Sequence, residues 1–182
     1  MASILNVDQI KTAAGTNAMT MDSSGYVSMP NTTELDIWVV PSNVTISSSS
    51  TTTLTSFSRW AADWEKIGTG MSESSGIFTF PSTGKWKVIA KLYWQGSNGG
   101  YYFGINGKVS TDSGSSYTDR AYAYQNAATS EYCDTTTVMY IDVTNASTFR
   151  VKLDVVTHAA GNVGGSTTVL KTYAVFEKIA AT

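Results

Sequence analysis

Side chains that most often carry enzyme chemistry are scarce in this sequence. Its 182 residues include one cysteine, Cys133, and one histidine, His158. A lone cysteine can form neither an intramolecular disulfide nor a paired-cysteine zinc site, and in a strand it is usually a small buried apolar residue. His158 lies in a loop rich in glycine and alanine, which offers little support for a catalytic triad. We therefore expect a protein that is not an enzyme and has no metal or cofactor.

Charge is also scarce. Charged residues make up 14% of the chain, against roughly 25% in a typical globular domain, and the formal net charge is -2. No basic patch is present to release counterions from nucleic acid, and no cationic amphipathic helix to bind a membrane. The sequence has no signal-peptide pattern and no run of about 18 apolar residues. We predict no nucleic-acid or membrane partner, and synthesis in a cytoplasm.

The sequence is rich in alternating apolar and polar residues, most clearly between Ile77 and Trp94. One face of this segment would hold Trp86, Val88, Ala90, Leu92 and Trp94, and the other would hold Lys85, Lys87 and Lys91. A period of two is typical of a strand with one side in a core and one in water. Pro81 to Gly84 precede this alternation and predict a turn between two strands.

Similar segments recur along the chain and predict the fold class. We expect strands at 35–40, 101–105, 121–125, 135–143, 149–155 and 169–179. Asn106-Gly107, a strong hairpin signal, should end the strand at 101–105. The Ser/Thr run at 47–53 fits either a flexible link or a hydroxyl-rich edge strand. About eight to ten short strands without a convincing helix predict an all-β sandwich or barrel.

The first thirty residues differ in character from the rest. Ile4, Leu5, Val7 and Ile10 form a short apolar cluster, and turn residues 22–25 separate two short alternating segments. This pattern predicts a hairpin, which is marginally stable alone and needs a surface to lie on. We therefore divide the chain into an anchoring arm at 1–30 and a main domain at 31–182. The alternative is a loose terminus.

Some predicted strands carry apolar side chains on both faces, more than a single sandwich core can cover. Tyrosine suits a subunit interface because it buries a ring and hydrogen-bonds through its hydroxyl. We therefore predict contacts with another copy of the chain, the alternative being a covering loop of the same chain. The candidate interface residues are Tyr101, Tyr102, Phe103, Tyr122, Tyr124, Tyr173 and Val175.

Three tryptophans are candidates for stacking on sugars. Trp60, Trp64 and Trp94 lie in or beside predicted loops, where exposed rings could bind a glycan. Tryptophan in a β-protein is more often part of the core, and that alternative is preferred here.

One motif resembles a known family. Phe78, Pro81, Gly84 and Trp86 fit the spacing aromatic-x-x-Pro-x-x-Gly-x-aromatic, and the chain closes with the aromatic strand at 172–176. This order resembles the jelly-roll head domain of complement-type and tumour-necrosis-factor-like trimers, over roughly residues 35–179. The resemblance implies a jelly-roll β-sandwich and a homotrimer. Trp86 replaces the usual tyrosine and no collagen stalk is present, so the ligands of the complement proteins are not carried over.

A second resemblance rests on three segments, two of which lie in the N-terminal arm. The segments at 4–10, 22–25 and 67–78 resemble virion proteins of tailed bacteriophages, especially marine phages. What this implies is a virion structural protein, made in the host cytoplasm, whose arm binds the major capsid protein or tail and baseplate proteins. The chain has few residues for a shaft, which favours capsid decoration or a head fibre over a tail fibre that attaches to host cells. A carbohydrate-binding module for host surface glycans is the remaining alternative.

Overall fold

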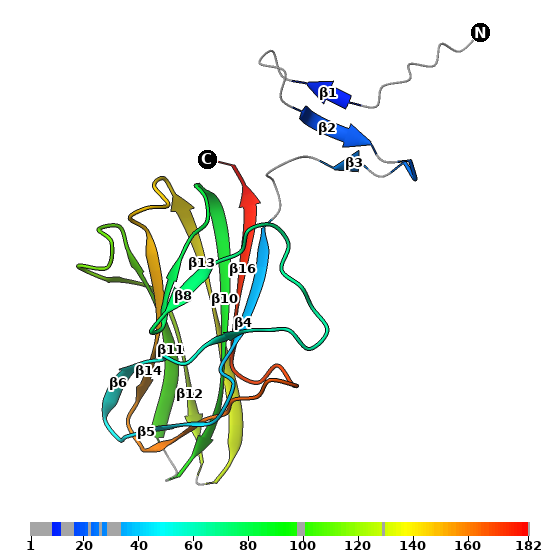
Figure 1. Ribbon diagram of the computed structural model, residues 1–182. Helices are drawn as coiled ribbons and strands as arrows, with labels where there is room; N and C mark the ends of the chain where they lie inside the picture. The colour runs from blue at the N-terminus through cyan, green and yellow to red at the C-terminus, as the bar shows by residue number, and fades with distance from the viewer. Residues whose placement is uncertain are drawn as a thin grey trace.

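All regular structure described for this chain is β-strand. The structure is a computed structural model that describes residues 9–11, 17–21, 23–25, 27–28, 34–97, 101–128 and 130–181. From Leu35 onward the described strands form two antiparallel sheets that face each other (Figure 1). The prediction of an all-β sandwich is confirmed. Among the described residues there is no helix that could span a membrane.

The first sheet, called here the β10 layer, has the order β13-β10-β16-β4-β7, with β15 and β5 continuing beside the last residues of β10. β10 pairs with β13 along one edge and with β16 and β15 along the other, which makes it the central strand. The strands are β4 (Leu35–Val39), β5 (Val44–Ile46), β7 (Ser58–Arg59), β10 (Gly84–Gly96), β13 (Tyr132–Val143), β15 (Gly161–Val163) and β16 (Tyr173–Ala180).

The second sheet, called here the β11 layer, has the order β12-β11-β14. On the other edge of β14, β9 pairs with the first residues of the strand and β6 pairs with its last residues. β8 pairs in turn with β9. Of the two alternatives for the Ser/Thr run, the strand is therefore correct, since β6 pairs with Asp154–Thr157. The strands are β6 (Ser50–Thr53), β8 (Ser72–Ser74), β9 (Ile77–Thr79), β11 (Tyr101–Ser110), β12 (Thr118–Ala127) and β14 (Arg150–Thr157).

The core lies between the two layers, and the alternation predicted for β10 defines one of its walls. The five apolar residues predicted to share a face are all buried: Trp86, Val88, Ala90, Leu92 and Trp94. Phe78 of β9 lies near the centre, with ring centroids 5.6 Å from Trp38, 5.0 Å from Phe57 and 4.7 Å from Phe176. Such aromatic packing adds to the free energy gained by burying apolar area.

The turn predicted at Pro81 to Gly84 carries the chain from one layer to the other. β9 pairs with β14 in the β11 layer, whereas β10 begins in the β10 layer at Gly84. Gly84 has a φ of 144°, and a Cβ at this position would meet the Lys178 side chain and the Ala180 carbonyl oxygen. The crossing between layers therefore requires glycine here.

The hairpin predicted at Asn106-Gly107 is wrong. β11 continues through both residues to Ser110, and the connection to β12 follows at 111–117. Asn106 is buried and its Nδ2 donates to Asp119 Oδ1, while a side chain at Gly107 would meet Met139 of the facing layer. Hydrogen bonding and close packing between layers, not a turn, explain these two residues.

The last strand also starts later than predicted. β16 begins at Tyr173, and Val169 and Leu170 precede it as exposed residues. Ser166 Oγ accepts hydrogen bonds from the backbone N–H groups of Thr168 and Val169 and holds this segment in a turn. Leu170 therefore does not share the core face of Ala174.

The N-terminal hairpin prediction is confirmed. β2 (Asn17–Met21) pairs with β3 (Val27–Ser28) across a turn that contains Gly25 at a φ of 84°, and β1 (Gln9–Lys11) pairs with the other edge of β2. Figure 1 shows this small sheet beyond one end of the sandwich. Ile10 is exposed in β1, whereas Ile4, Leu5 and Val7 lie outside the described residues. The division into an arm and a domain stays a prediction.

Candidate interaction surfaces

The structure separates the seven predicted interface residues. Tyr173 and Val175 point outward from the β10 layer and are half-buried, while Tyr102, Tyr122 and Tyr124 are exposed on the outer face of the β11 layer. Phe103 is wrong as an interface residue, because strand alternation turns it into the core, where it is 1% exposed. The side chain of Tyr101 lies outside the described residues. The seven residues therefore do not form one surface.

The outer face of the β10 layer carries an apolar row across four strands. In register, Ile37 of β4 lies beside Val175 of β16, Val175 beside Ile89 of β10, and Ile89 beside Val138 of β13. Val138 is 40% exposed, and the neighbouring Tyr140 is 70% exposed. A continuous apolar row on a solvent-facing sheet is typical of an interaction surface. We call Ile37, Val175, Ile89, Val138 and Tyr140 the apolar row.

Paired charges flank the apolar row on both sides. Lys87, between Glu177 and Tyr140 in register, has its Nζ 3.4 Å from Glu177 Oε2. Lys91, between Tyr173 and Thr136, forms an ion pair with Asp134. Because each lysine already has a carboxylate partner in the same chain, a second copy could cover this face without leaving either cation unpaired.

The predicted sugar-stacking role does not fit Trp94 or Trp60. Trp94 is 2% exposed and stacks on Phe103 in the core, with ring centroids 5.5 Å apart. Trp60 is also buried, and its Nε1 donates to Asp63. Trp64 is half-buried and lines an open hollow of 290 Å³ with Arg59, Trp60 and Lys66. The core alternative is therefore correct for two of the three tryptophans.

A buried carboxylate organises the segment next to these tryptophans. Asp36 of β4, 1% exposed, accepts hydrogen bonds from Trp38 Nε1, the Met71 backbone N–H and both Nε and Nη2 of Arg59. The Arg59 guanidinium also lies 4.6 Å from the Trp38 ring centroid. Asp36 thus fixes both ends of the loop between β7 and β8. Sequence reasoning missed it because a single acidic residue in a strand gives no periodic signal.

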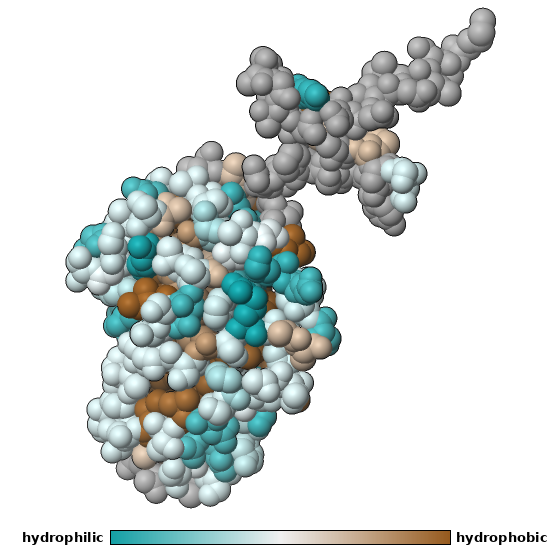
Figure 2. All heavy atoms as spheres, in the orientation of Figure 1, coloured by the Kyte–Doolittle hydropathy of each residue, from teal (hydrophilic) through white to brown (hydrophobic). Residues whose placement is uncertain are grey.

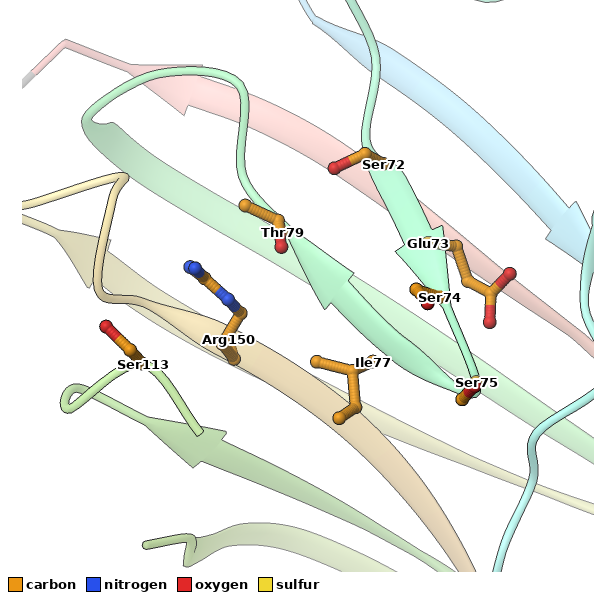
Figure 3. Close-up of a pocket in the computed structure, with 8 residues that line it drawn as sticks. All are labelled: Ser72, Glu73, Ser74, Ser75, Ile77, Thr79, Ser113 and Arg150. Atoms are coloured by element: carbon orange, nitrogen blue, oxygen red, sulfur yellow. The ribbon is translucent and has the colours of Figure 1, made fainter. Parts of the chain in front are cut away.

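A hydroxyl-lined hollow of 510 Å³ lies beside the β8–β9 hairpin (Figure 3). Its lining includes Arg150 and Ser113 on one side and the hairpin on the other, and the Glu73 carboxylate is turned away from Arg150. The Arg150 guanidinium donates to the carbonyl oxygens of Ala146, Phe149 and Ser147, and Glu73 Oε1 accepts the Gly76 N–H. Both charged side chains therefore stabilise neighbouring turns through hydrogen bonds to the backbone.

Exposed tyrosines cluster on the outer face of the β11 layer. Ring centroids are 6.0 Å apart for Tyr122 and Tyr124 and 5.7 Å apart for Tyr102 and Tyr124. The His158 ring lies 5.9 Å from Tyr102. Burial raises the pKa of Tyr124, and the neighbouring Tyr102, Tyr122 and Asp119 raise it further, so its hydroxyl stays protonated at neutral pH. We call Tyr102, Tyr122 and Tyr124 the tyrosine cluster.

An ion network lies beside the tyrosine cluster. Asp154 of β14 is 2% exposed and contacts Lys108 Nζ at 3.2 Å, Lys152 Nζ at 3.5 Å and the Thr53 hydroxyl at 2.6 Å. Lys108 Nζ also lies 3.3 Å from Asp119. Burial alone would lower the pKa of Lys108, but its hydrogen bonds and charge attraction to Asp154 and Asp119 raise it above the ordinary value. Both lysines beside the cluster therefore keep acidic partners.

The described residues contain no group of three or more histidine, cysteine or acidic side chains placed to hold a metal ion. Cys133 is half-buried and packs against the core. Figure 2 shows a face made mostly of pale, weakly polar side chains, with several brown apolar groups and a few teal, strongly hydrophilic groups between them. The surface in view is thus suited to contacts through aromatic, aliphatic and hydroxyl groups rather than through dense charge.

Comparison with known proteins identifies the fold. No protein-family model and no curated protein matches this chain. Murine APRIL at pH 5.0 matches with a TM-score of 0.60 and 10% identity, over 80% of this chain and 98% of its own. Eiger TNF from S. frugiperda matches with a TM-score of 0.60 and 11% identity, over 84% and 96% of the two chains. Murine APRIL at pH 8.0 matches with a TM-score of 0.56 and 12% identity.

These matches define the class of fold and nothing finer. The sandwich is a jelly roll of the tumour-necrosis-factor type, as the motif around Pro81 and Gly84 implied. At 10% to 12% identity, the ligands of those proteins cannot be transferred to this chain.

Proposed function

We propose that this chain is a non-enzymatic structural protein of a tailed-bacteriophage virion, a homotrimeric jelly-roll knob attached to the particle through its N-terminal arm. The observation that carries the trimer is the apolar row, which crosses four strands of one sheet face. The tumour-necrosis-factor-like fold favours three copies, since the resemblance seen in the sequence is to trimeric head domains.

The interface is formed by the outer face of the β10 layer. Ile89 and Val175 lie near the middle of this face, and Tyr140 supplies a large ring close to them. Such a centre, surrounded by paired charges, matches the usual anatomy of a stable interface. Tyr173 and Val175 remain interface residues in this proposal, and Val138, Ile89 and Tyr140 join them. Tyr102, Tyr122 and Tyr124 are left outside the interface.

Attachment to the virion is assigned to residues 1–30. The sheet of β1, β2 and β3 lies beyond one end of the sandwich in Figure 1, on the side where β16 ends. A small sheet of this kind is marginal alone and gains stability by packing on another surface. The resemblance of segments 4–10, 22–25 and 67–78 to phage virion proteins supports the proposal that the particle is that surface. Capsid decoration or a head fibre is the proposed position, and a tail fibre is the second candidate.

Deleting residues 1–30 tests the attachment. The truncated chain should fail to bind virions that lack the protein, while its native mass stays that of a trimer. The exposed Lys11 of the full chain should cross-link to the major capsid protein. Cross-links to tail or baseplate proteins would move the protein to a tail fibre, and virion binding by the truncated chain would disprove the role of the arm.

A further inference from the structure

The two outer faces of the sandwich carry different kinds of exposed side chain. On the β10 layer, aliphatic residues such as Ile89, Val138 and Val175 accompany the tyrosines. On the β11 layer, the tyrosine cluster is accompanied by amide, carboxylate and threonine groups, including Asn126, Asp119 and Thr53. Protein interfaces combine aromatic with aliphatic anchors, whereas rings mixed with hydrogen-bonding groups suit a polar ligand with some apolar surface.

The rings of the tyrosine cluster are inclined to one another. The planes of the Tyr122 and Tyr124 rings differ by 31°, and the Tyr102 ring stands at 90° to the Tyr124 ring. Gly104 allows the Tyr124 ring its position, because any Cβ there would collide with that ring. The ring therefore lies directly over the backbone of β11. Tyr122 and Tyr124 stay 58% and 50% exposed, so ring surface is open to a ligand.

The Asp119 carboxylate lies beyond Tyr122 at one end of the tyrosine cluster. Asn106 is opposite Tyr122 in register and its Nδ2 donates to Asp119 Oδ1 at 3.0 Å. Lys108 Nζ contacts the same oxygen at 3.3 Å. Both contacts use Oδ1, so Oδ2 is left to accept hydrogen bonds from a ligand. A carboxylate fixed in this way accepts well from hydroxyl groups.

From this arrangement we infer that the tyrosine cluster and Asp119 form a binding site for a neutral oligosaccharide. The C–H face of a pyranose packs on Tyr122 and Tyr124, Tyr102 limits its position, and Asp119 Oδ2 accepts from its hydroxyls. Lys108 and Lys152 are already paired with Asp119 and Asp154, so neither lysine is free to bind an acidic sugar. This inference concerns the face opposite the proposed trimer interface and holds whether or not the chain binds a virion.

An array of neutral gluco-, galacto-, manno- and N-acetylglucosamine oligosaccharides, probed with the full chain, tests the site. We expect retention on at least one of these sugars. Tyr122→Ala and Tyr124→Ala should each weaken that binding about tenfold, the scale of one lost ring contact. Tyr124→Phe keeps the ring and should change it by less than about threefold. Tyr132→Ala, which removes an exposed ring from β13 of the other layer, should leave it unchanged.

Three results would overturn the inference. They are the absence of binding to every neutral oligosaccharide on the array, binding that survives both alanine variants, and a changed native mass in those variants. The last result would make the cluster a contact between copies. Circular dichroism of each variant separates a lost ring from a lost fold, and native mass reports separately on the proposed trimer.

Discussion

At the residue scale, Asp36 shows how one buried group can hold a long loop. It receives four hydrogen bonds from three residues, and one of these, Arg59, also carries the compensating charge. Asp36 is buried although Arg59 is partly exposed, and removing the Asp36 charge is costly because the donors that surround it lose their acceptor.

Asp36→Asn should lower the free energy of unfolding by about 3 kcal/mol, since an amide NH₂ would face donors that now meet a carboxylate. Chemical denaturation measures the change. The exposed Asp142 provides the control, and Asp142→Asn should stay within about 0.5 kcal/mol of the parent. Equal stabilities for the two variants would contradict the role given to Asp36.

Asp112 is a second residue whose partners can be tested, here by pH. Hydrogen bonds from Ser110 Oγ, Ser116 Oγ and the Ser116 N–H lower the pKa of its carboxyl from 3.8 to about 2. Because the folded pKa is depressed, the charged form stabilises the loop above pH 3.8, and this contribution is lost as pH falls to about 2. The Ser116 amide resonance should shift with a midpoint near pH 2, and Asp112→Asn should abolish that transition. A midpoint at 3.8 would disprove these hydrogen bonds.

At the element scale, the β8–β9 hairpin turns through Ser75 and Gly76, whose φ angles are 53° and 81°. Two positive φ values in a two-residue loop are typical of a type I′ turn. A Cβ at Gly76 would collide with the backbone carbonyl of Leu54, which cannot move as a flexible side chain can. Gly76 is thus required both by its φ and by the close approach of another segment.

Gly76→Ala should therefore lower the free energy of unfolding by roughly 2 to 3 kcal/mol, measured by denaturant unfolding. Ser75→Gly is the matched control, since glycine accepts the positive φ that serine adopts there, and it should change stability by less than about 1 kcal/mol. Equal free energies of unfolding for Gly76→Ala and Ser75→Gly would contradict the close approach of the Leu54 carbonyl group to Gly76.

Strands were predictable from this sequence wherever alternation met a one-sided core. β10 and β14 follow that pattern, and their inward residues, such as Trp86 and Leu153, are buried. Prediction failed where a residue type has two physical uses. Asn106-Gly107 reads as a turn, yet the amide bonds Asp119 and the glycine makes room for Met139. The site residues on different strands could not be grouped, because cross-strand register is set by long-range pairing.

At the scale of the whole molecule, the jelly roll presents two exposed sheet faces with different chemistry. The β10 layer offers the apolar row between paired charges, and the β11 layer offers the tyrosine cluster beside an ion network. We assign the first face to contacts between copies and the second to a ligand. The small N-terminal sheet lies beyond one end of the sandwich (Figure 1), where it is available to bind a particle.

The native mass of the purified chain tests the central claim most directly, compared between the parent and two matched variants. Val175 and Val156 are both half-buried valines near the middle of a sheet, on the opposite outer faces. The parent and Val156→Glu should each have three times the 19.5 kDa mass of one chain, whereas Val175→Glu should have the mass of a single chain. A monomeric parent, or a Val175→Glu variant that remains a trimer, would contradict the proposed interface.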